Sequence, residues 1–265
     1  MKRAPIGVFD SGVGGLSILR ALRTELPWED FVYVADSGHA PYGERDAAHA
    51  LARSRVIAAH LRAAYDIKAL VMACNTATAA AIDALRQEQP DLPIVGVEPA
   101  LKPALAQSRT GRIGVMATRS TLASAKFRAL LASLAGQAEF VCQACDGLAD
   151  AIEQEATEKI AAFCNSYANA MGQFGAHPGE IDTLVLGCTH YPFAAESIRR
   201  LVGPSVHLVD NGEAVARQTR RLLQALANGA TPGQVVLLST GERSALQRAA
   251  QRWLALDGRV EPLLL

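Results

Sequence analysis

Residues 70–76 read Leu-Val-Met-Ala-Cys-Asn-Thr, and residues 184–190 read Leu-Val-Leu-Gly-Cys-Thr-His. In each segment an apolar run ends at a small residue, and a cysteine with polar neighbours follows: Cys74 in the first segment and Cys188 in the second. Short apolar runs of this kind are typical of buried parallel strands. Because ligands bind outside the carboxyl ends of such strands, the two thiols are predicted to face each other across one substrate.

Around these segments the chain alternates between strand-like and helix-like patterns. Strands are predicted at 6–9, 31–35, 68–73, 94–97, 112–116, 139–142, 183–186, 206–209 and 235–238. Helical spacing of apolar residues follows most of them, as in residues 44–65 and in the alanine-rich stretch 76–89. Alternation of this kind predicts an α/β fold with parallel sheets covered by helices.

A faint internal repeat indicates duplication. Residues 6–11, Ile-Gly-Val-Phe-Asp-Ser, resemble residues 113–118, Ile-Gly-Val-Met-Ala-Thr, and a cysteine segment follows each of them. We therefore predict two similar doubly wound parallel-sheet domains, related by a pseudo-two-fold, with the active site between them. The first would comprise residues 1–98 plus 210–228 and carry Cys74; the second would comprise 99–209 plus 229–265 and carry Cys188. The alternative is a chance likeness of common strand ends.

The bulk composition narrows the functional classes. The chain has 265 residues, of which 50% are hydrophobic and 20% charged, so it can bury a well-packed core. Its formal net charge of zero argues against nucleic acid or an anionic membrane as partner. No apolar stretch approaches the length of a membrane span, and a cytoplasmic location is predicted. Five cysteines make an odd number, which favours free thiols.

The two cysteines permit acid–base chemistry at one carbon. A thiol acts as a base only when ionised, and a helix N-terminus after a strand stabilises the thiolate. Facing thiols can take a proton from one face of a carbon and return it to the other. A single strand-end cysteine is more often a small buried hydrophobe, but the matched pair favours function. His190, two residues after Cys188, is a suitable partner for that thiolate.

The sequence around other residues indicates a role in the site less strongly. Asp10 ends a strand before the glycine-rich turn 12–15, which suits a small anion better than a dinucleotide because it lacks the G-x-G-x-x-G spacing. Asp36 is predicted to be an ordinary turn or capping residue. The pair Cys142-x-x-Cys145 has no second metal-ligand pair, so those thiols and Cys164 are predicted to be inert. No lysine has a pyridoxal-site context, so neither a cofactor nor a metal is expected.

Four motifs carry a resemblance to a known family. They are Gly-Val-Phe-Asp-Ser-Gly-Val-Gly-Gly-Leu at 7–16, Ala-Pro-Tyr-Gly at 40–43, Ala-Cys-Asn-Thr-Ala-Thr at 73–78 and Gly-Cys-Thr-His-Tyr-Pro at 187–192. With them the chain resembles the glutamate racemases of the cofactor-independent aspartate/glutamate racemase superfamily, over residues 6 to about 216. The resemblance implies two α/β domains with the substrate between them.

The resemblance also implies roles for individual residues. Cys74 and Cys188 would be the two proton donors and acceptors, assisted by Asp10, Glu153 and His190. Glu153 lies at the expected count after Cys145, although this chain lacks the prolines that the family usually has in that segment. Residues that would hold the substrate are Asp10, Ser11, Tyr42, Gly43, Asn75, Thr76, Thr118, Thr121, Thr189 and His190.

The implied activity is the interconversion of L- and D-glutamate without a cofactor, supplying D-glutamate for peptidoglycan. Glutamate would be the partner, with no nucleic acid and no membrane, and a homodimer is left open. One alternative is a racemase of aspartate or another amino acid in the same superfamily. A second alternative, from another class, is a non-catalytic protein that binds an amino acid and regulates another process.

Overall fold

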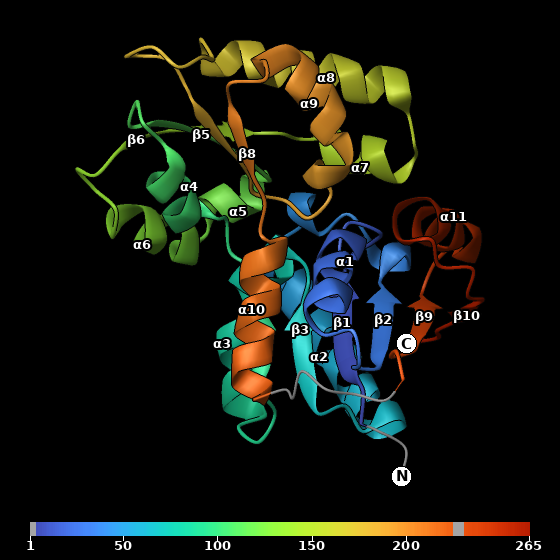
Figure 1. Cartoon of the computed structure of the whole chain (residues 1–265). Helices are drawn as coiled ribbons and strands as arrows, with labels where there is room; N and C mark the ends of the chain where they lie inside the picture. The colour runs from blue at the N-terminus through green and yellow to red at the C-terminus, as the bar shows by residue number, and fades with distance from the viewer. Residues whose placement is uncertain (1–3, 225–230) are drawn as a thin grey trace. The chain divides into compact units, whose positions relative to one another are not determined.

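A computed structural model describes residues 4–224 and 231–265 of the chain. It divides the chain into two compact units, one made of residues up to Val97 and from Gly212 onward, the other of Glu98–Asn211. Each unit contains one parallel sheet flanked by helices (Figure 1). Within the described residues, no helix is both long and apolar enough to cross a membrane.

The first unit is built on a six-stranded sheet with the order β10-β9-β2-β1-β3-β4, in which every pairing is parallel. Helices α1 and α10 pack together on one face of this sheet, and α2 and α3 cover the other (Figure 1). The strands are β1 Ile6–Asp10, β2 Phe31–Ala35, β3 Ala69–Met72, β4 Ile94–Gly96, β9 Val235–Ser239 and β10 Val260–Pro262. The helices are α1 Leu16–Glu25, α2 Ala47–Tyr65, α3 Asn75–Glu88, α10 Gly212–Leu223 and α11 Arg243–Leu254.

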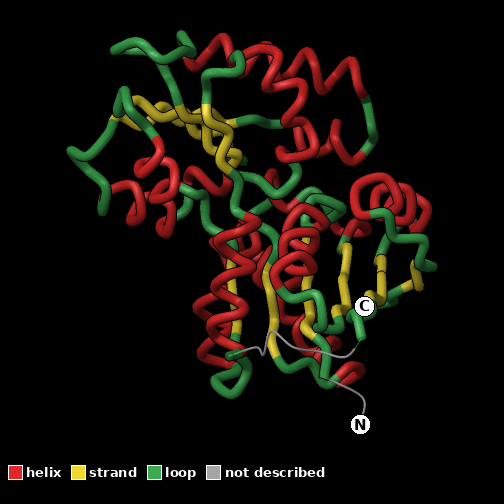
Figure 2. The backbone as a smooth tube through the Cα atoms, viewed as in Figure 1, coloured by secondary structure: helices red, strands yellow, loops and turns green. Residues whose placement is uncertain are grey.

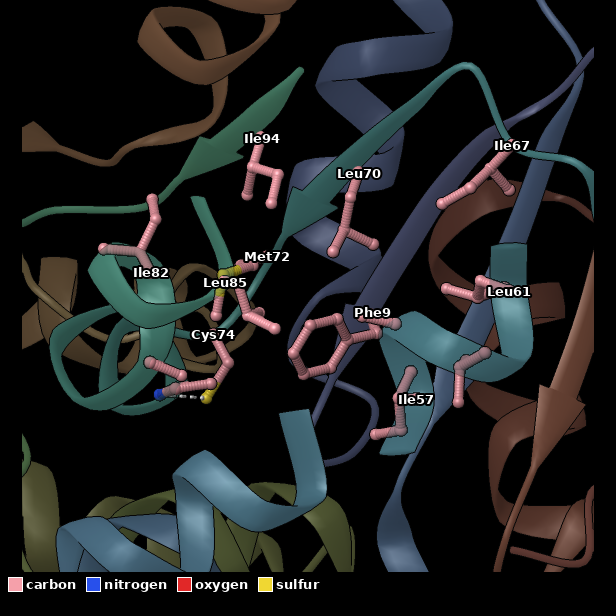
Figure 3. Packing of buried hydrophobic residues seen from close by; sticks show 14 of the residues in the cluster. Phe9, Ile57, Leu61, Ile67, Leu70, Met72, Cys74, Ile82, Leu85 and Ile94 are labelled. Atoms are coloured by element: carbon pink, nitrogen blue, oxygen red, sulfur yellow. Dashed lines mark hydrogen bonds between the residues drawn. The ribbon is translucent and has the colours of Figure 1, made fainter. Parts of the chain in front are cut away.

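The core of this unit lies between the sheet and helices α2 and α3. Phe9 of β1, Leu70 of β3, Ile57 of α2 and Leu85 of α3 belong to one buried cluster (Figure 3). These side chains are fully buried, and each such burial contributes about 1.5–3 kcal/mol relative to exposure. Cys74 lies at the edge of this cluster, so a rigid framework holds its sulfur.

The second unit is built on a four-stranded sheet with the order β6-β5-β7-β8, also entirely parallel. Figure 2 distinguishes strands, helices and loops by colour. Ile113 and Val115 of β5 and Val185 of β7 pack against Leu101 and Phe127 of the covering helices. The strands are β5 Arg112–Ala117, β6 Glu139–Ala144, β7 Thr183–Leu186 and β8 His207–Val209. The helices are α4 Leu101–Gln107, α5 Arg119–Ala123, α6 Ala125–Ala132, α7 Leu148–Glu153, α8 Thr157–Met171 and α9 Ala195–Val202.

The two sheets repeat one topology. In the first unit the chain builds β2-β1-β3-β4, and in the second it builds β6-β5-β7-β8, so in both the first strand lies between the second and the third. The predicted α/β class with parallel sheets in two domains is confirmed. In such an order the connections leave the first and third strands in opposite directions. The carboxyl ends of β1 and β3, and likewise those of β5 and β7, are therefore the places where a ligand is expected.

One predicted domain assignment is wrong. Residues 229–265 were expected in the second domain, but β9 pairs with β2 of the first sheet, from Phe31 beside Val235 onward, and β10 pairs with β9. Residues 231–265 therefore belong to the first unit, whereas the predicted change of domain between residues 228 and 229 lies outside the described residues. Residue 98 and residues 210–211 fall in the second unit, not the first. Strand β10 was not predicted.

Candidate active site

Each of the two cysteines singled out in the sequence follows the third strand of its sheet in the same register. Met72 pairs with Phe9, and the amide of Ala73 donates to the carbonyl of Phe9 at 2.7 Å. In the second unit Leu186 pairs with Met116, and the amide of Gly187 donates to the carbonyl of Met116 at 2.7 Å. Cys74 and Cys188 are the next residues, so both thiols lie beyond the carboxyl end of a central strand. Both are buried.

In the first unit the Cys74 sulfur lies at the beginning of helix α3. Cys74 is the N-cap of this helix, and its sulfur accepts a hydrogen bond from the amide of Ala77 at 3.5 Å (Figure 3). The Ser11 hydroxyl lies 3.7 Å from the same sulfur. Donors at a helix N-terminus favour a negative charge on the group they contact. The surroundings of Cys74 therefore suit a thiolate.

Asp10 organises the turn beside Cys74. One carboxylate oxygen accepts the amide of Ser11 at 2.7 Å and its hydroxyl at 3.3 Å, and the other accepts the amide of Gly15. A Cβ at Gly15 would lie 2.6 Å from the Cβ of Asp10 and 2.9 Å from the Tyr33 hydroxyl, so glycine is required there. The Tyr33 hydroxyl in turn donates to the carbonyl of Gly12 at 2.6 Å. The glycine-rich turn is thus packed around the Asp10 carboxylate.

The first turn of α3 contributes two more of the predicted residues. Asn75 and Thr76 are both buried, directly after the Cys74 cap. The side-chain amide of Asn75 donates to the carbonyl of Val97 at 3.4 Å, whereas its Oδ1 is buried without a hydrogen-bond partner among the described residues. A buried acceptor that lacks a donor is costly and uncommon. Asn75 Oδ1 therefore marks a place where a ligand can supply a donor.

The Tyr42–Gly43 segment lies in the loop between β2 and α2. The Tyr42 side chain is buried, and its hydroxyl donates to the Asp36 carboxylate at 2.5 Å. The phenol is therefore engaged inside the protein. This loop was expected to offer both a phenol and backbone amides, and in the structure the phenol serves to hold the loop.

In the second unit Cys188, His190 and Glu153 form a chain of contacts. The Cys188 sulfur lies 3.6 Å from His190 Nδ1, and His190 Nε2 lies 2.7 Å from a carboxylate oxygen of Glu153. Burial would lower the pKa of His190, but its hydrogen bonds and charge interactions with Cys188 and Glu153 raise that pKa well above its usual value. The imidazole is therefore protonated near neutral pH and places a positive charge beside the Cys188 sulfur.

The predicted threonines of the second unit lie at the carboxyl end of β5. Thr118 caps helix α5: its hydroxyl accepts the amide of Thr121 at 3.2 Å and donates to the Thr121 hydroxyl at 2.9 Å. In strand register Thr118 occupies the position that Ser11 occupies in the first unit. Thr189 is buried directly after Cys188. Both sheets thus present hydroxyl groups close to a strand-end cysteine.

The remaining cysteines lie in different environments. Burial raises the pKa of Cys164 to about 11, and burial also raises the pKa of Cys145, beside which the Cys188 and Cys164 charges act in the same direction. These two thiols are therefore protonated at neutral pH. Cys142 is exposed on β6. Among the described residues no group of three or more histidine, cysteine or acidic side chains is arranged to hold a metal ion.

Two residues of the site region were missed by sequence reasoning. Tyr191 is fully buried, and its hydroxyl donates to the carbonyl of Cys145 at 3.3 Å, which ties the segment after Cys188 to the start of α7. Asp36 was expected to be an ordinary turn or capping residue, but it is fully buried and paired with Arg53 of α2. The available signal was the position of Arg53, one helical turn before the buried Ile57 and two before Leu61.

The contact between His190 and Glu153 predicts a pH-dependent stability. In the unfolded chain His190 has an ordinary pKa near 6.5, and in the folded chain its pKa is higher. The extra stability is therefore complete below the unfolded pKa and disappears as the pH rises through the folded pKa. We expect Glu153→Gln to lower the free energy of unfolding by about 2 kcal/mol at about pH 6 and by less in alkaline solution.

Urea unfolding of both proteins at several pH values measures this difference. The control is Glu196→Gln, which removes the carboxylate from an exposed ion pair with Arg200 in the same unit and should change little at any pH. A Glu153→Gln deficit that stays constant or grows as the pH rises would contradict the assignment.

Comparison with known proteins shows which protein family has a similar sequence. The model of the Asp/Glu/hydantoin racemase family matches residues 14–219 of the chain. A glutamate racemase from Ectopseudomonas mendocina is 48% identical to it over 266 residues, which covers 100% of this chain and 95% of that protein.

Solved structures agree with the sequence relatives. A glutamate racemase isoform from Bacillus anthracis has a TM-score of 0.87 and 31% identity, with 100% of this chain and 99% of that chain covered. The glutamate racemase from Francisella tularensis, solved in complex with D-glutamate, has a TM-score of 0.82 and 26% identity, with 98% and 97% covered. The likeness therefore extends over both units.

Proposed function

Since this chain belongs to the Asp/Glu/hydantoin racemase family and is a racemase, we propose that its reaction is the interconversion of L- and D-glutamate. The observation that carries the proposal is the equivalence of Cys74 and Cys188, each of which follows the third strand of a sheet with the same strand order. Relatives and structural neighbours named as glutamate racemases support glutamate as the substrate.

The proposed mechanism uses the two thiols as a pair of acid–base groups. One thiolate removes the α-proton of glutamate, which leaves a carbanion, and the other thiol delivers a proton to the opposite face of that carbon. Cys74 acts on the D-isomer and Cys188 on the L-isomer. The α-proton leaves as the S–H of one cysteine, and the electron pair it leaves behind accepts the proton of the other. No redox step is involved, and this scheme needs no cofactor.

The two thiolates are stabilised by different means. Cys74 relies on the N-terminus of α3, where the amide of Ala77 donates a hydrogen bond to its sulfur, and the Ser11 hydroxyl lies 3.7 Å from the same sulfur. Cys188 relies on the protonated His190, which Glu153 holds in place from the other side of the ring. This difference predicts that the two directions of the reaction have different pH dependences in kcat.

Substrate binding follows from the polar groups near each thiol. Ser11, Thr76, Thr118, Thr121 and Thr189 supply hydroxyls, and the amides at the starts of α3 and α5 suit carboxylates. The substrate ammonium requires an acceptor, and the buried Oδ1 of Asn75 lacks a donor. Asp10 adds negative charge at the same strand ends. We place the side-chain carboxylate at the Tyr42–Gly43 loop.

A pocket that holds the side-chain carboxylate with amides and hydroxyls selects by length. Aspartate is one methylene shorter than glutamate and would leave polar groups of the pocket unpaired, which costs about 1–3 kcal/mol for each buried group. We therefore expect kcat/KM for aspartate to be lower than that for glutamate by about tenfold or more. The D-glutamate produced would serve peptidoglycan synthesis. A cytoplasmic location and a homodimer remain predictions.

Circular dichroism of L-glutamate and of D-glutamate with the purified protein tests this proposal. The signal from either isomer should decay to zero, because a racemase brings both to the same equal mixture. The same assay with aspartate tests the substrate, and equal kcat/KM on both amino acids would contradict the pocket assignment. Binding of glutamate with no decay of the signal would favour a non-catalytic binding protein instead.

A further inference from the structure

The loop between β2 and α2 is held by a buried charged network centred on Asp36. The Asp36 side chain is fully buried, and Arg53 donates to both of its oxygens, from Nε at 2.8 Å and from Nη2 at 2.9 Å. The Tyr42 hydroxyl donates at 2.5 Å and the Thr240 hydroxyl at 2.8 Å. His39 Nδ1 lies 3.1 Å from the same carboxylate. The carboxylate therefore connects the beginning and the middle of this loop to α2 and to the residue after β9.

In this network Asp36 is ionised and Tyr42 is neutral. Burial alone would raise the pKa of Asp36, but hydrogen bonds from Arg53, Tyr42 and Thr240 hold that pKa below its usual value. Burial and the negative charge of Asp36 raise the pKa of Tyr42, so its hydroxyl stays a donor. Bidentate pairing of arginine with a carboxylate is stronger and more directional than pairing with lysine. Arg53 is therefore suited to fix the orientation of Asp36.

We propose that Arg53 is a positioning residue for the Tyr42–Gly43 loop, acting through Asp36. This inference rests on the proposed function, in which that loop binds the side-chain carboxylate of the substrate. Arg53 itself does not contact the reacting atoms. Its action passes from the guanidinium to Asp36, from Asp36 to the Tyr42 hydroxyl, and so to the backbone of the loop.

The position of Arg53 in α2 supports a dedicated role. Its side chain is 12% exposed and lies one turn before Ile57 and two turns before Leu61, on the face of α2 that packs against the sheet. An apolar residue would continue that face at lower desolvation cost. This position instead carries an arginine whose partner is the carboxylate that accepts the Tyr42 hydroxyl.

A second helix residue and the end of β9 hold the same loop. His49, one turn before Arg53, lies edge-on to the Tyr42 ring at 5.5 Å, and its Nε2 lies 3.1 Å from the carbonyl of His39. The amide of Gly38 donates to the Thr240 hydroxyl at 3.2 Å. A Cβ at Gly38 would lie 2.6 Å from the carbonyl oxygen of Thr240, so the two loops meet backbone to backbone. Removing the Asp36–Arg53 pair therefore loosens the centre of an otherwise anchored loop.

Arg53→Met, Arg53→Lys and the control Arg55→Met test the inference. Arg55 lies on the same helix and forms an exposed ion pair with Glu88, so it matches Arg53 in residue type, partner type and helix. We expect Arg53→Met to raise KM for glutamate by about tenfold with little change in kcat, because loop contacts bind substrate and transition state alike. Arg53→Lys should fall between that variant and the wild type, and Arg55→Met should equal the wild type.

The division between KM and kcat is the informative measurement. The equilibrium constant of a racemisation is one, so kcat/KM must fall by the same factor in both directions whatever the cause. A fall in kcat with unchanged KM in Arg53→Met would overturn the inference, as would kinetic constants equal to those of Arg55→Met. Calorimetric titration with D-glutamate gives an independent reading, and its Kd should rise by the same factor as KM.

A second variant guards against unfolding of the first, since Arg53→Met leaves a buried carboxylate without its cation. The double variant Arg53→Met/Asp36→Asn removes both charges and keeps an acceptor for Tyr42. It should be folded by circular dichroism and should still show the raised KM. A folded double variant with the KM of the wild type would overturn the inference.

The failure of this inference can be distinguished from failure of the proposed function. If the wild type does not racemise glutamate, the proposed function is wrong, and amide hydrogen exchange of residues 37–45 still tests Arg53. Exchange in that segment should be faster in Arg53→Met than in Arg55→Met. Equal exchange in the two variants would overturn the positioning role.

Discussion

Cys74→Ser and Cys188→Ser should each lower the rate of glutamate racemisation by about 10³-fold or more, and in both directions. A serine hydroxyl is a far weaker acid than a thiol. At neutral pH it is therefore not ionised and cannot remove the α-proton as a base, and it is also a poor acid for delivering a proton to the carbanion. Because the proposed mechanism has two steps in series on opposite faces of one carbon, loss of either thiol should stop the whole exchange. The rate of decay of the circular dichroism signal measures this effect.

Cys142→Ser is the matched control, because Cys142 is exposed on β6 and has no place in the proposed chemistry. It should keep the activity of the wild type. If either Cys74→Ser or Cys188→Ser racemises glutamate at the wild-type rate, the two-thiol mechanism is wrong.

A substrate analogue with a leaving group on the β-carbon distinguishes the two thiols. Elimination from such a compound needs removal of the α-proton but no delivery of a proton to the opposite face. Cys188→Ser retains Cys74 and should eliminate from the D-analogue, whereas Cys74→Ser should eliminate from the L-analogue. The reverse preference would exchange the assignments of the two cysteines.

The strand ends were predictable because their signals are local. The runs before Cys74 and Cys188 are short, apolar and bounded by small residues, and the structure places both in parallel strands, β3 and β7. The glycine-rich turn after Asp10 has a similarly local cause, since a side chain at Gly15 would collide with Asp10. The alternation of strands and helices follows from the same short-range patterns.

Which sheet a strand joins depends on long-range pairing, and the predicted domain of the C-terminal strands was wrong for that reason. Residues 235–239 have the apolar character of a strand, but nothing in them specifies β2 as their neighbour rather than a strand of the second sheet. In the structure β9 pairs with β2 along its whole length, and Thr240, the residue after β9, donates its hydroxyl to Asp36, the residue after β2. A contact between residues so far apart in the chain leaves no periodic signal.

The buried Asp36–Arg53 pair was hidden for a related reason. Aspartate after a strand is common in turns, and arginine on a long helix is commonly exposed, so each residue alone has an ordinary explanation.

Glu153, by contrast, was expected at this position from the sequence. The segment before it lacks the prolines of the resembling family, but Gly147, the N-cap of α7, lies in the left-handed region at φ 75°, and the helix ends at Glu153, 2.7 Å from His190.

His190→Asn should lower kcat/KM for glutamate by about 10²-fold in both directions. Asparagine keeps a polar group beside Cys188 but carries no positive charge. The protonated His190 lies 3.6 Å from the Cys188 sulfur and stabilises a thiolate there, so its loss reduces the fraction of enzyme that can remove the proton from L-glutamate. The control is His177→Asn, which replaces an exposed histidine of the same unit and should leave kcat/KM unchanged.

The pH profile separates this electrostatic role from simple disturbance of packing. Burial alone would lower the pKa of His190, but contacts with Cys188 and Glu153 raise it well above its usual value, so the wild type keeps the imidazolium to a higher pH than a free histidine does and loses it on the alkaline side. Its kcat/KM should therefore fall as the pH rises through that folded pKa. His190→Asn has no imidazolium to lose, so this alkaline fall should be absent. A variant that keeps the alkaline fall of the wild type would show that another group causes it, and His190 would then be confined to holding the segment around Cys188 in place.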